Sequence, residues 1–268
     1  MLSFFTRSGE KIFHYILFVT SLVGALTWYA MGSDLGFLVI NTVNEVGRGA
    51  SRQIFYPKYI LWVVSFPAYA IMLGLLSGTS WATIVYHVFL AWTWVIGYLV
   101  AGFTVSNYKW GFFAFSTIAW MALAAGTLID SGRHAVRVKA TRDYYILAVW
   151  GNLLWVQYPL AWGLTDGGNK LGVVAGFIWF GILDVCMIPF ASVVILLMAR
   201  RWDYNRLNIA FTQYGRVQTQ PGTFPEKEPA PLPSEGVTGP GPAPVAPTHA
   251  HMAPTHQHAA PVAGDQVV

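Results

Sequence analysis

The chain has 268 residues, of which 55% are hydrophobic and only 10% are charged, and its formal net charge is +4. Soluble domains carry about 25% charged residues. This composition therefore excludes a typical soluble enzyme, a nucleic-acid binder built on basic patches, and a disordered protein. The single cysteine, Cys186, excludes an internal disulfide framework. The remaining class is a polytopic α-helical membrane protein, for which the lipid bilayer is the first predicted partner.

Six segments are apolar over a length that can cross a bilayer, which takes about 20 residues. They are residues 12–31, 58–78, 81–103, 110–129, 144–164 and 172–198. Backbone groups in lipid must be paired within their own segment, so all six are predicted to be helices. Between the first two, the stretches LGFLVINTV and RQIFY flank Gly47 and Gly49 and are expected to form a small hairpin.

Composition and charge also predict the domain boundaries and the topology. We expect a transmembrane bundle over residues 1–202, a juxtamembrane cytoplasmic segment over 203–220 and a disordered tail rich in proline, alanine and histidine over 221–268. Lysine and arginine are in excess at the N-terminus, in the 130–143 loop and after the last span, so both termini are predicted to be cytoplasmic. The histidines of the tail are more typical of low-complexity sequence than of weak metal binding, and no metal site is predicted.

Titratable side chains are nearly absent from the six spans. Asp184 is the one acid in the middle of a span, and His87 is the only other mid-span candidate for a proton relay. Charged groups inside a bilayer are costly and usually functional, so Asp184 is a candidate site residue. A lone histidine in a membrane helix is more often a packing residue.

Aromatic residues form two notable groups near prolines. Three of them recur at i, i+3 and i+7, on one face of a helix that Pro159 is expected to kink: Trp155, Tyr158 and Trp162. In an earlier span Trp62 precedes Pro67, which predicts a second kinked helix with an aromatic side chain. Each aromatic residue alone is more typical of packing or of the membrane interface, but the combination is more specific.

These motifs closely resemble the microbial (type I) rhodopsins. The pattern W-x-x-Y-P-x-x-W, followed one helix later by L-D-V, is similar to helices six and seven of that family, and RQIFYPKYILWVVSFP resembles its third helix. The resemblance covers about residues 10–200 and implies an all-α, rhodopsin-like helical bundle. That family has seven helices, and the first span here matches the second of them, so the family's first helix is expected to be missing.

The resemblance also implies which functional positions are altered. A lysine four residues after the helix-seven aspartate forms the retinal Schiff base, and here that position is Ile188, which has no amine. The proton-acceptor position before the tryptophan is Leu61, the proton-donor position is Met72, and the usual arginine is Lys58. Covalent retinal and light-driven proton pumping are therefore excluded by the family's mechanism.

The altered positions resemble those of the fungal opsin-related proteins without the lysine, which include the thirty-kilodalton heat-shock membrane proteins. This resemblance implies a non-photoactive plasma-membrane stress protein, not an enzyme, that is chaperone-like or regulates a proton ATPase through protein contacts. A second hypothesis is a non-covalent site for a retinoid or another apolar ligand, and a third is residual ion-channel or transporter activity. The family's pocket positions are kept as Trp62, Trp155, Tyr158, Trp162 and Asp184. A structural cluster in which Tyr158 and Lys58 pair with Asp184 is the alternative role for these polar groups.

Overall fold

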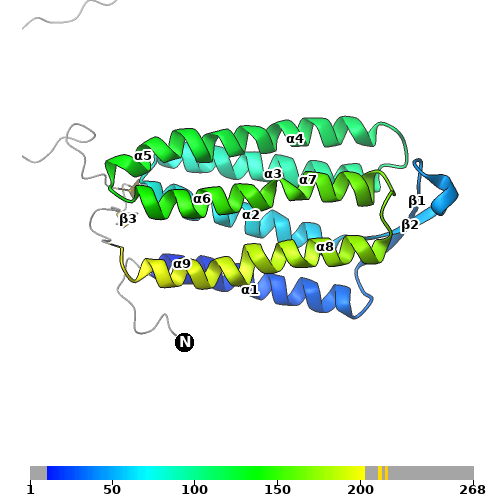
Figure 1. Ribbon diagram of the computed structural model, residues 1–268, viewed down its shortest axis with the longest axis horizontal. Coiled ribbons are helices and arrows are strands. Elements are labelled where there is room, and N and C mark those ends of the chain that lie inside the picture. The colour runs from blue at the N-terminus through cyan, green and yellow to red at the C-terminus, as the bar shows by residue number, and fades with distance from the viewer. Residues whose placement is uncertain (1–10, 203–210, 213–214, 217–268) are drawn as a thin grey trace, which may run out of the picture. The chain divides into compact units, whose positions relative to one another are not determined.

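The computed structural model describes residues 11–202, 211–212 and 215–216, and its long helices form a bundle of six rods (Figure 1). Helices α1 (Lys11–Gly32), α2 (Pro57–Ser77) and α3 (Trp81–Phe103) are one rod each. The other three rods are chains of shorter segments, each with one π-helical turn. They are α4 (Lys109–Ala125), η3 (Gly126–Asp130) and α5 (Ser131–Arg137); α6 (Thr141–Trp155), α7 (Gln157–Trp162) and η4 (Gly163–Gly167); and α8 (Val173–Val185), η5 (Cys186–Phe190) and α9 (Ala191–Ala199).

The predicted six-span helical bundle is confirmed. Five of the rods in the described part of the chain are by themselves long and apolar enough to cross a membrane. The sixth, over residues 141–167, is interrupted at Val156, between α6 and α7. Pro159 explains this break, because it has no N–H to donate to the carbonyl of Trp155.

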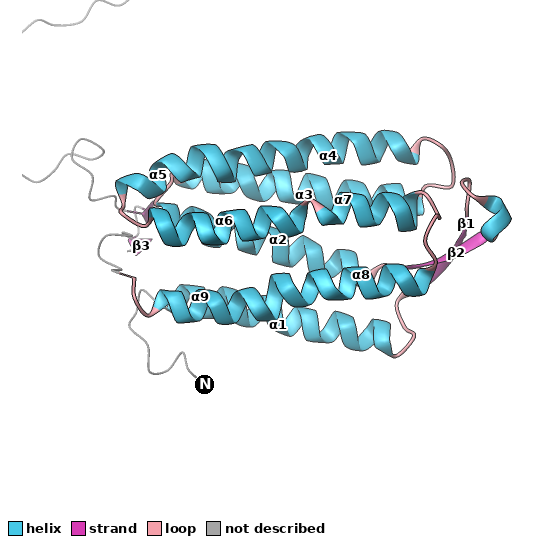
Figure 2. Ribbon diagram, viewed as in Figure 1, coloured by secondary structure: helices cyan, strands magenta, loops and turns pink. Residues whose placement is uncertain are grey.

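The segment between the first two rods forms the predicted hairpin. Strands β1 (Phe37–Asn41) and β2 (Ser51–Phe55) pair antiparallel, with Phe37 opposite Phe55, and the short helix η2 (Val46–Arg48) lies in the connection. The hairpin projects from the end of the bundle opposite to α5 (Figures 1 and 2). We refer to this end as the hairpin end.

Two further short strands, β3 (Phe211–Thr212) and β4 (Gly215–Arg216), pair with each other. They fall in the segment 203–220 that the sequence assigns to a juxtamembrane region. The rest of that segment and the predicted tail over 221–268 lie outside the described residues.

Helix α2 is the central element of the bundle. In its most apolar stretch of 18 residues, 78% of the residues are buried. The corresponding share is 22–44% in the other four membrane-length rods. A helix that is apolar all round is suited to this position, because it contacts protein on most of its faces. Side chains on α2 can therefore reach partners on several other elements.

Pro67 lies inside α2, yet the helix continues through it. Proline has no N–H, so the carbonyl of Val63, one turn earlier, loses its usual donor. The indole Nε1 of Trp92 on α3 donates to that carbonyl at 3.1 Å. The neighbouring helix thus replaces the missing hydrogen bond, as buried backbone groups in a bilayer require.

Helices α3 and α4 approach closely at a glycine. A methyl group placed on Gly97 would lie 1.8 Å from Ser116 Oγ and 3.0 Å from Ser116 Cβ. Small residues allow such close backbone contact between membrane helices, where association depends on packing. Gly97 therefore sets the distance between these two rods.

Candidate functional site

Asp184 is the centre of a buried polar cluster that joins three helices. It lies on α8 and is 2% exposed. Its Oδ1 accepts hydrogen bonds from Trp62 Nε1 on α2 at 3.0 Å and from the Tyr158 hydroxyl on α7 at 2.9 Å. Among the described residues, its Oδ2 has no hydrogen-bond partner. Three of the five predicted pocket residues are thus in direct contact, and the carboxylate links α2, α7 and α8.

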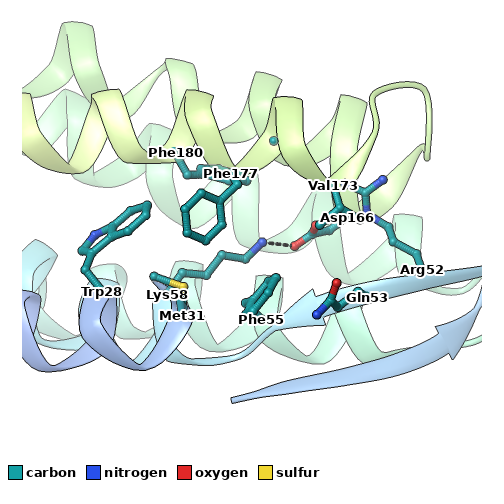
Figure 3. Close-up of a pocket in the computed structure, with 11 residues that line it drawn as sticks. Trp28, Met31, Arg52, Gln53, Phe55, Lys58, Asp166, Val173, Phe177 and Phe180 are labelled. Atoms are coloured by element: carbon teal, nitrogen blue, oxygen red, sulfur yellow. Dashed lines mark hydrogen bonds and ion pairs between the residues drawn. The ribbon is translucent and has the colours of Figure 1, made fainter. Parts of the chain in front are cut away.

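A second buried cluster lies nearer the hairpin end and is centred on Asp166 in η4. Lys58, in the first turn of α2, forms an ion pair and hydrogen bond with its Oδ2 (Figure 3). The Tyr59 hydroxyl donates to the same oxygen at 2.8 Å and accepts from Trp162 Nε1 at 2.9 Å. Arg52 on β2 approaches the other oxygen, with 3.5 Å between Arg52 Nε and Asp166 Oδ1.

Arg52 also anchors the hairpin to the loop before α8. Its Nη1 donates to Asn169 Oδ1 at 3.0 Å and to the Leu171 carbonyl at 2.7 Å. The side chain is 3% exposed although it comes from a strand outside the six rods. A buried arginine requires partners for its donors, and here they come from a carboxylate, an amide and a backbone carbonyl.

The expected pairing of Lys58 with Asp184 is wrong, because the lysine pairs with Asp166. Lys58 lies one helical turn before Trp62 on α2, so it reaches the level of Asp166 while Trp62 reaches Asp184. Sequence reasoning considered acids in the middle of spans and missed Asp166 at the end of one. A usable signal was its position four residues after Trp162, which places both on one helix face.

The aromatic pocket positions pack directly on one another around Phe66. The Phe66 ring centroid lies 4.8 Å from those of Tyr158 and Trp94, and about 6 Å from those of Trp62 and Trp155. Trp62 and Tyr158 also meet edge-on at 5.2 Å. Side chains therefore occupy the space between these rings, and Phe66 is a member of the cluster that the sequence analysis did not identify.

Trp162 belongs to a different group. Its ring stacks on Phe113 at 5.1 Å and lies 5.2 Å from Tyr98, while its N–H bonds to Tyr59 in the Asp166 cluster. Of the five predicted pocket residues, four therefore lie in the connected Phe66 and Asp184 clusters, namely Trp62, Trp155, Tyr158 and Asp184. Trp162 lies in the Asp166 cluster.

Three of the four altered positions are buried in apolar surroundings, and the fourth, Lys58, is in the Asp166 cluster. Leu61, Met72 and Ile188 are between 0 and 6% exposed. Leu61 and Ile188 both face Gly24 of α1, because a methyl group placed there would lie 3.6 Å from Leu61 Cδ1 and 3.9 Å from Ile188 Cδ1. The positions that the resemblance assigns to the Schiff base and its counterion are therefore in one apolar contact region between α1, α2 and η5.

Comparison with solved structures defines the class of protein. The light-driven proton pump LR (Mac) from Leptosphaeria maculans matches with a TM-score of 0.69 and 27% identity over 75% of this chain and 87% of that one. Halorhodopsin, a light-driven chloride pump, has a TM-score of 0.70 at 19% identity. The chain is thus a multi-pass membrane protein with the microbial rhodopsin fold.

Sequence relatives narrow this class, although no family model matches. Protein FDD123 of Trametes versicolor is 33% identical over 78% of this chain and 75% of its own length. The opsin-like protein carO of Fusarium fujikuroi is 29% identical over 75% and 67%, and the 30 kDa heat shock protein of Saccharomyces cerevisiae is 26% identical over 73% and 65%. The chain belongs to the family of fungal opsin-like proteins.

Proposed function

We propose that this chain is a non-photoactive opsin-like protein of the plasma membrane, with both termini in the cytoplasm, that acts in a stress response through contacts with another membrane protein. The single observation that carries the proposal is the apolar contact of Leu61 and Ile188 at Gly24. Retinal attachment needs an amine at that place and a carboxylate to balance it, and neither residue supplies one. The similarity to a 30 kDa heat shock protein supports the stress role.

The partner we propose is an integral membrane protein, such as a proton-pumping ATPase, towards which the chain is regulatory or chaperone-like. Contact is the favoured mode of action because the buried clusters are occupied by their own side chains. Phe66 fills the space among the aromatic rings, and Asp184 and Asp166 are each held by donors from other elements. The outward faces of the rods, by contrast, carry many exposed apolar side chains.

Reconstitution with retinal tests the non-photoactive character. We expect the purified wild-type protein, incubated with all-trans retinal and then denatured in acid, to carry no covalent adduct. Ile188→Lys introduces the amine, but Leu61 leaves it without its usual counterion at position 61, so vesicles of this variant should show no light-driven pH change. The variant that combines Ile188→Lys with Leu61→Asp is the matched comparison.

Two outcomes of this experiment would change the proposal. A covalent adduct in the wild-type protein would contradict it. A shifted visible band that disappears on denaturation without an adduct would replace it with the second hypothesis, a non-covalent retinoid site.

Photo-crosslinking from the outward faces tests the proposed protein contact. Six apolar side chains, one on each rod, are similarly exposed and suit replacement by a photoreactive residue: Leu22, Ile60, Val85, Ile118, Leu153 and Ile178. A specific partner should give adducts in intact membranes from one or two adjacent rods only, because an interface covers one side of the bundle. Adducts of equal yield from all six positions, or from none, would contradict a specific contact.

A further inference from the structure

The end of the bundle opposite to the hairpin, which we call the α5 end, has a contact that joins three rods at Trp202. The Trp202 indole Nε1 donates to Asp143 Oδ2 on α6 at 2.8 Å, and its ring meets that of Phe13 on α1 edge-on at 5.2 Å. Trp202 itself comes directly after the rod that ends with α9. Figure 1 shows the starts of α1 and α6 and the end of α9 at this end of the bundle. One half-buried side chain therefore holds three rod ends together.

Four basic residues, which we call the basic set, surround this contact. One precedes Phe13 by two residues, one directly precedes Asp143, and two directly precede Trp202: Lys11, Arg142, Arg200 and Arg201. Consecutive Cα atoms are about 3.8 Å apart. Because the three contact residues touch one another, the backbones of all four basic residues are brought close together from three different rods.

The charge of the basic set is not neutralised by its neighbours. Its three arginines are exposed, so their guanidinium groups are charged at neutral pH. Within the described part of the chain, none of the four residues forms an ion pair. Asp143 is the one carboxylate among the three contact residues, and it accepts its hydrogen bond from the uncharged indole. The flanking charges in the sequence cancel: Arg7, Glu10, Asp203 and Arg206.

The basic set lies where a spanning rod meets the membrane surface. Tryptophan next to the end of a span is typical of the membrane–water interface. One helical turn towards the middle of the bilayer, Tyr15 follows Lys11 by four residues and is 57% exposed, and Leu197 precedes Arg200 by three and is 56% exposed. A lipid beside this end therefore meets cations at its headgroup and apolar side chains below them.

We propose that the basic set binds the headgroup of one anionic phospholipid from the adjacent leaflet. The lipid phosphate accepts charge-assisted hydrogen bonds from the arginines, whose planar groups bind phosphate through two N–H donors. The acyl chains lie along the exposed apolar side chains of α1 and α9. Trp202 is a positioning residue, because it brings cations of three rods to one place. The inference does not depend on the proposed function, since it requires only that the bundle spans a membrane.

Native mass spectrometry of the full chain, released from detergent micelles, tests the proposal. The probes are dioleoylphosphatidylserine and dioleoylphosphatidylcholine, which have the same acyl chains and differ in the net charge of the headgroup. We expect one serine lipid to bind per chain at a lipid concentration about tenfold lower than the choline lipid needs. Equal binding of the two lipids would overturn the proposal.

Two triple variants distinguish a site from diffuse surface charge. Combining Arg142→Gln, Arg200→Gln and Arg201→Gln should weaken binding of the serine lipid about tenfold or more. The matched control combines Arg133→Gln, Arg137→Gln and Lys139→Gln, which removes the same charge from exposed residues at the same end of the bundle. The control should bind the serine lipid within about twofold of the wild type. Equal losses in both triple variants would overturn the site in favour of a general attraction to anionic membranes.

Substitution of Trp202 tests its positioning role without changing any charge. Trp202→Ala should lower the preference for the serine lipid over the choline lipid about fivefold. Trp202→Phe keeps a ring beside Phe13 and loses the bond to Asp143, so its preference should lie between those of the alanine variant and the wild type. Thermal unfolding shows which variants are folded. A folded Trp202→Ala protein with the preference of the wild type would overturn the inference that the three rods form one site.

Discussion

Replacing Asp166 by asparagine is expected to lower the free energy of unfolding by about 3–5 kcal/mol, the range found when one partner of a buried ion pair is removed. Asp166 is the carboxylate between Arg52 and Lys58, and the side chains of all three are at most 9% exposed. Its loss leaves two buried cations without a counterion and removes the acceptor of the Tyr59 hydroxyl. The hairpin, α2 and η4 meet at this carboxylate, so one substitution weakens three connections.

Equilibrium unfolding in mixed micelles, followed by circular dichroism, measures this loss. The matched control is Asp34→Asn, because Asp34 is exposed and accepts one hydrogen bond from Gln53. The control should change the free energy of unfolding by less than about 0.5 kcal/mol. Adding Lys58→Met to Asp166→Asn should recover part of the stability, since it removes one unpaired buried charge. Equal stabilities of Asp166→Asn and Asp34→Asn would show that the Asp166 ion pairs do not stabilise the fold.

Trp62→Ala is expected to cost about 3–5 kcal/mol of unfolding free energy, as large-to-small substitutions of buried tryptophan do. The Trp62 ring is 1% exposed and lies 5.0–5.2 Å from the rings of Tyr59, Tyr158 and Phe180. It also donates to Asp184. The alanine variant therefore loses packing against two other helices, α7 and α8, and against Tyr59 of its own helix, together with one hydrogen bond to a buried carboxylate.

Trp62→Phe separates these two contributions. Phenylalanine keeps most of the ring contacts and has no N–H, so this variant should lose about 1–3 kcal/mol, the cost of removing one donor from a buried acceptor. The same unfolding measurement ranks the wild type, Trp62→Phe and Trp62→Ala in decreasing stability. A Trp62→Phe protein as stable as the wild type would mean that the bond to Asp184 makes no net contribution.

The features that were predictable from sequence are those set by local pattern. Apolar stretches of about 20 residues define the spans because lipid requires helices. The hairpin followed from two β-prone stretches around Gly47 and Gly49. Asp184 was identifiable because it is an acid in an apolar span, and its contact with Tyr158 was expected and is observed.

The Asp166 cluster could not be predicted in the same way. Its members come from a strand, the first turn of α2 and a π-helical turn, and the pair Lys58 and Asp166 is separated by 108 positions in the chain. Such a contact depends on how the rods are staggered along their axes, which no local periodicity records. The same stagger explains why Lys58 does not reach Asp184. The position of Phe66 among the aromatic rings could not be predicted for a related reason. A phenylalanine in an apolar helix has no sequence feature that distinguishes it from the other apolar residues.

The hydrogen bond from Trp92 to the carbonyl of Val63 has a consequence for the biogenesis of the protein. An unpaired carbonyl is costly in hydrocarbon, and the carbonyl that Pro67 deprives of its usual donor on α2 is paired by Trp92 of the neighbouring helix. A newly made α2 is therefore incomplete in lipid until α3 arrives beside it. Only Gly78, Thr79 and Ser80 separate the two helices, so they are able to leave the translocation machinery as one helical hairpin. Proline in the second of the six spans thus gives the third span a part in completing the backbone hydrogen bonds of its neighbour.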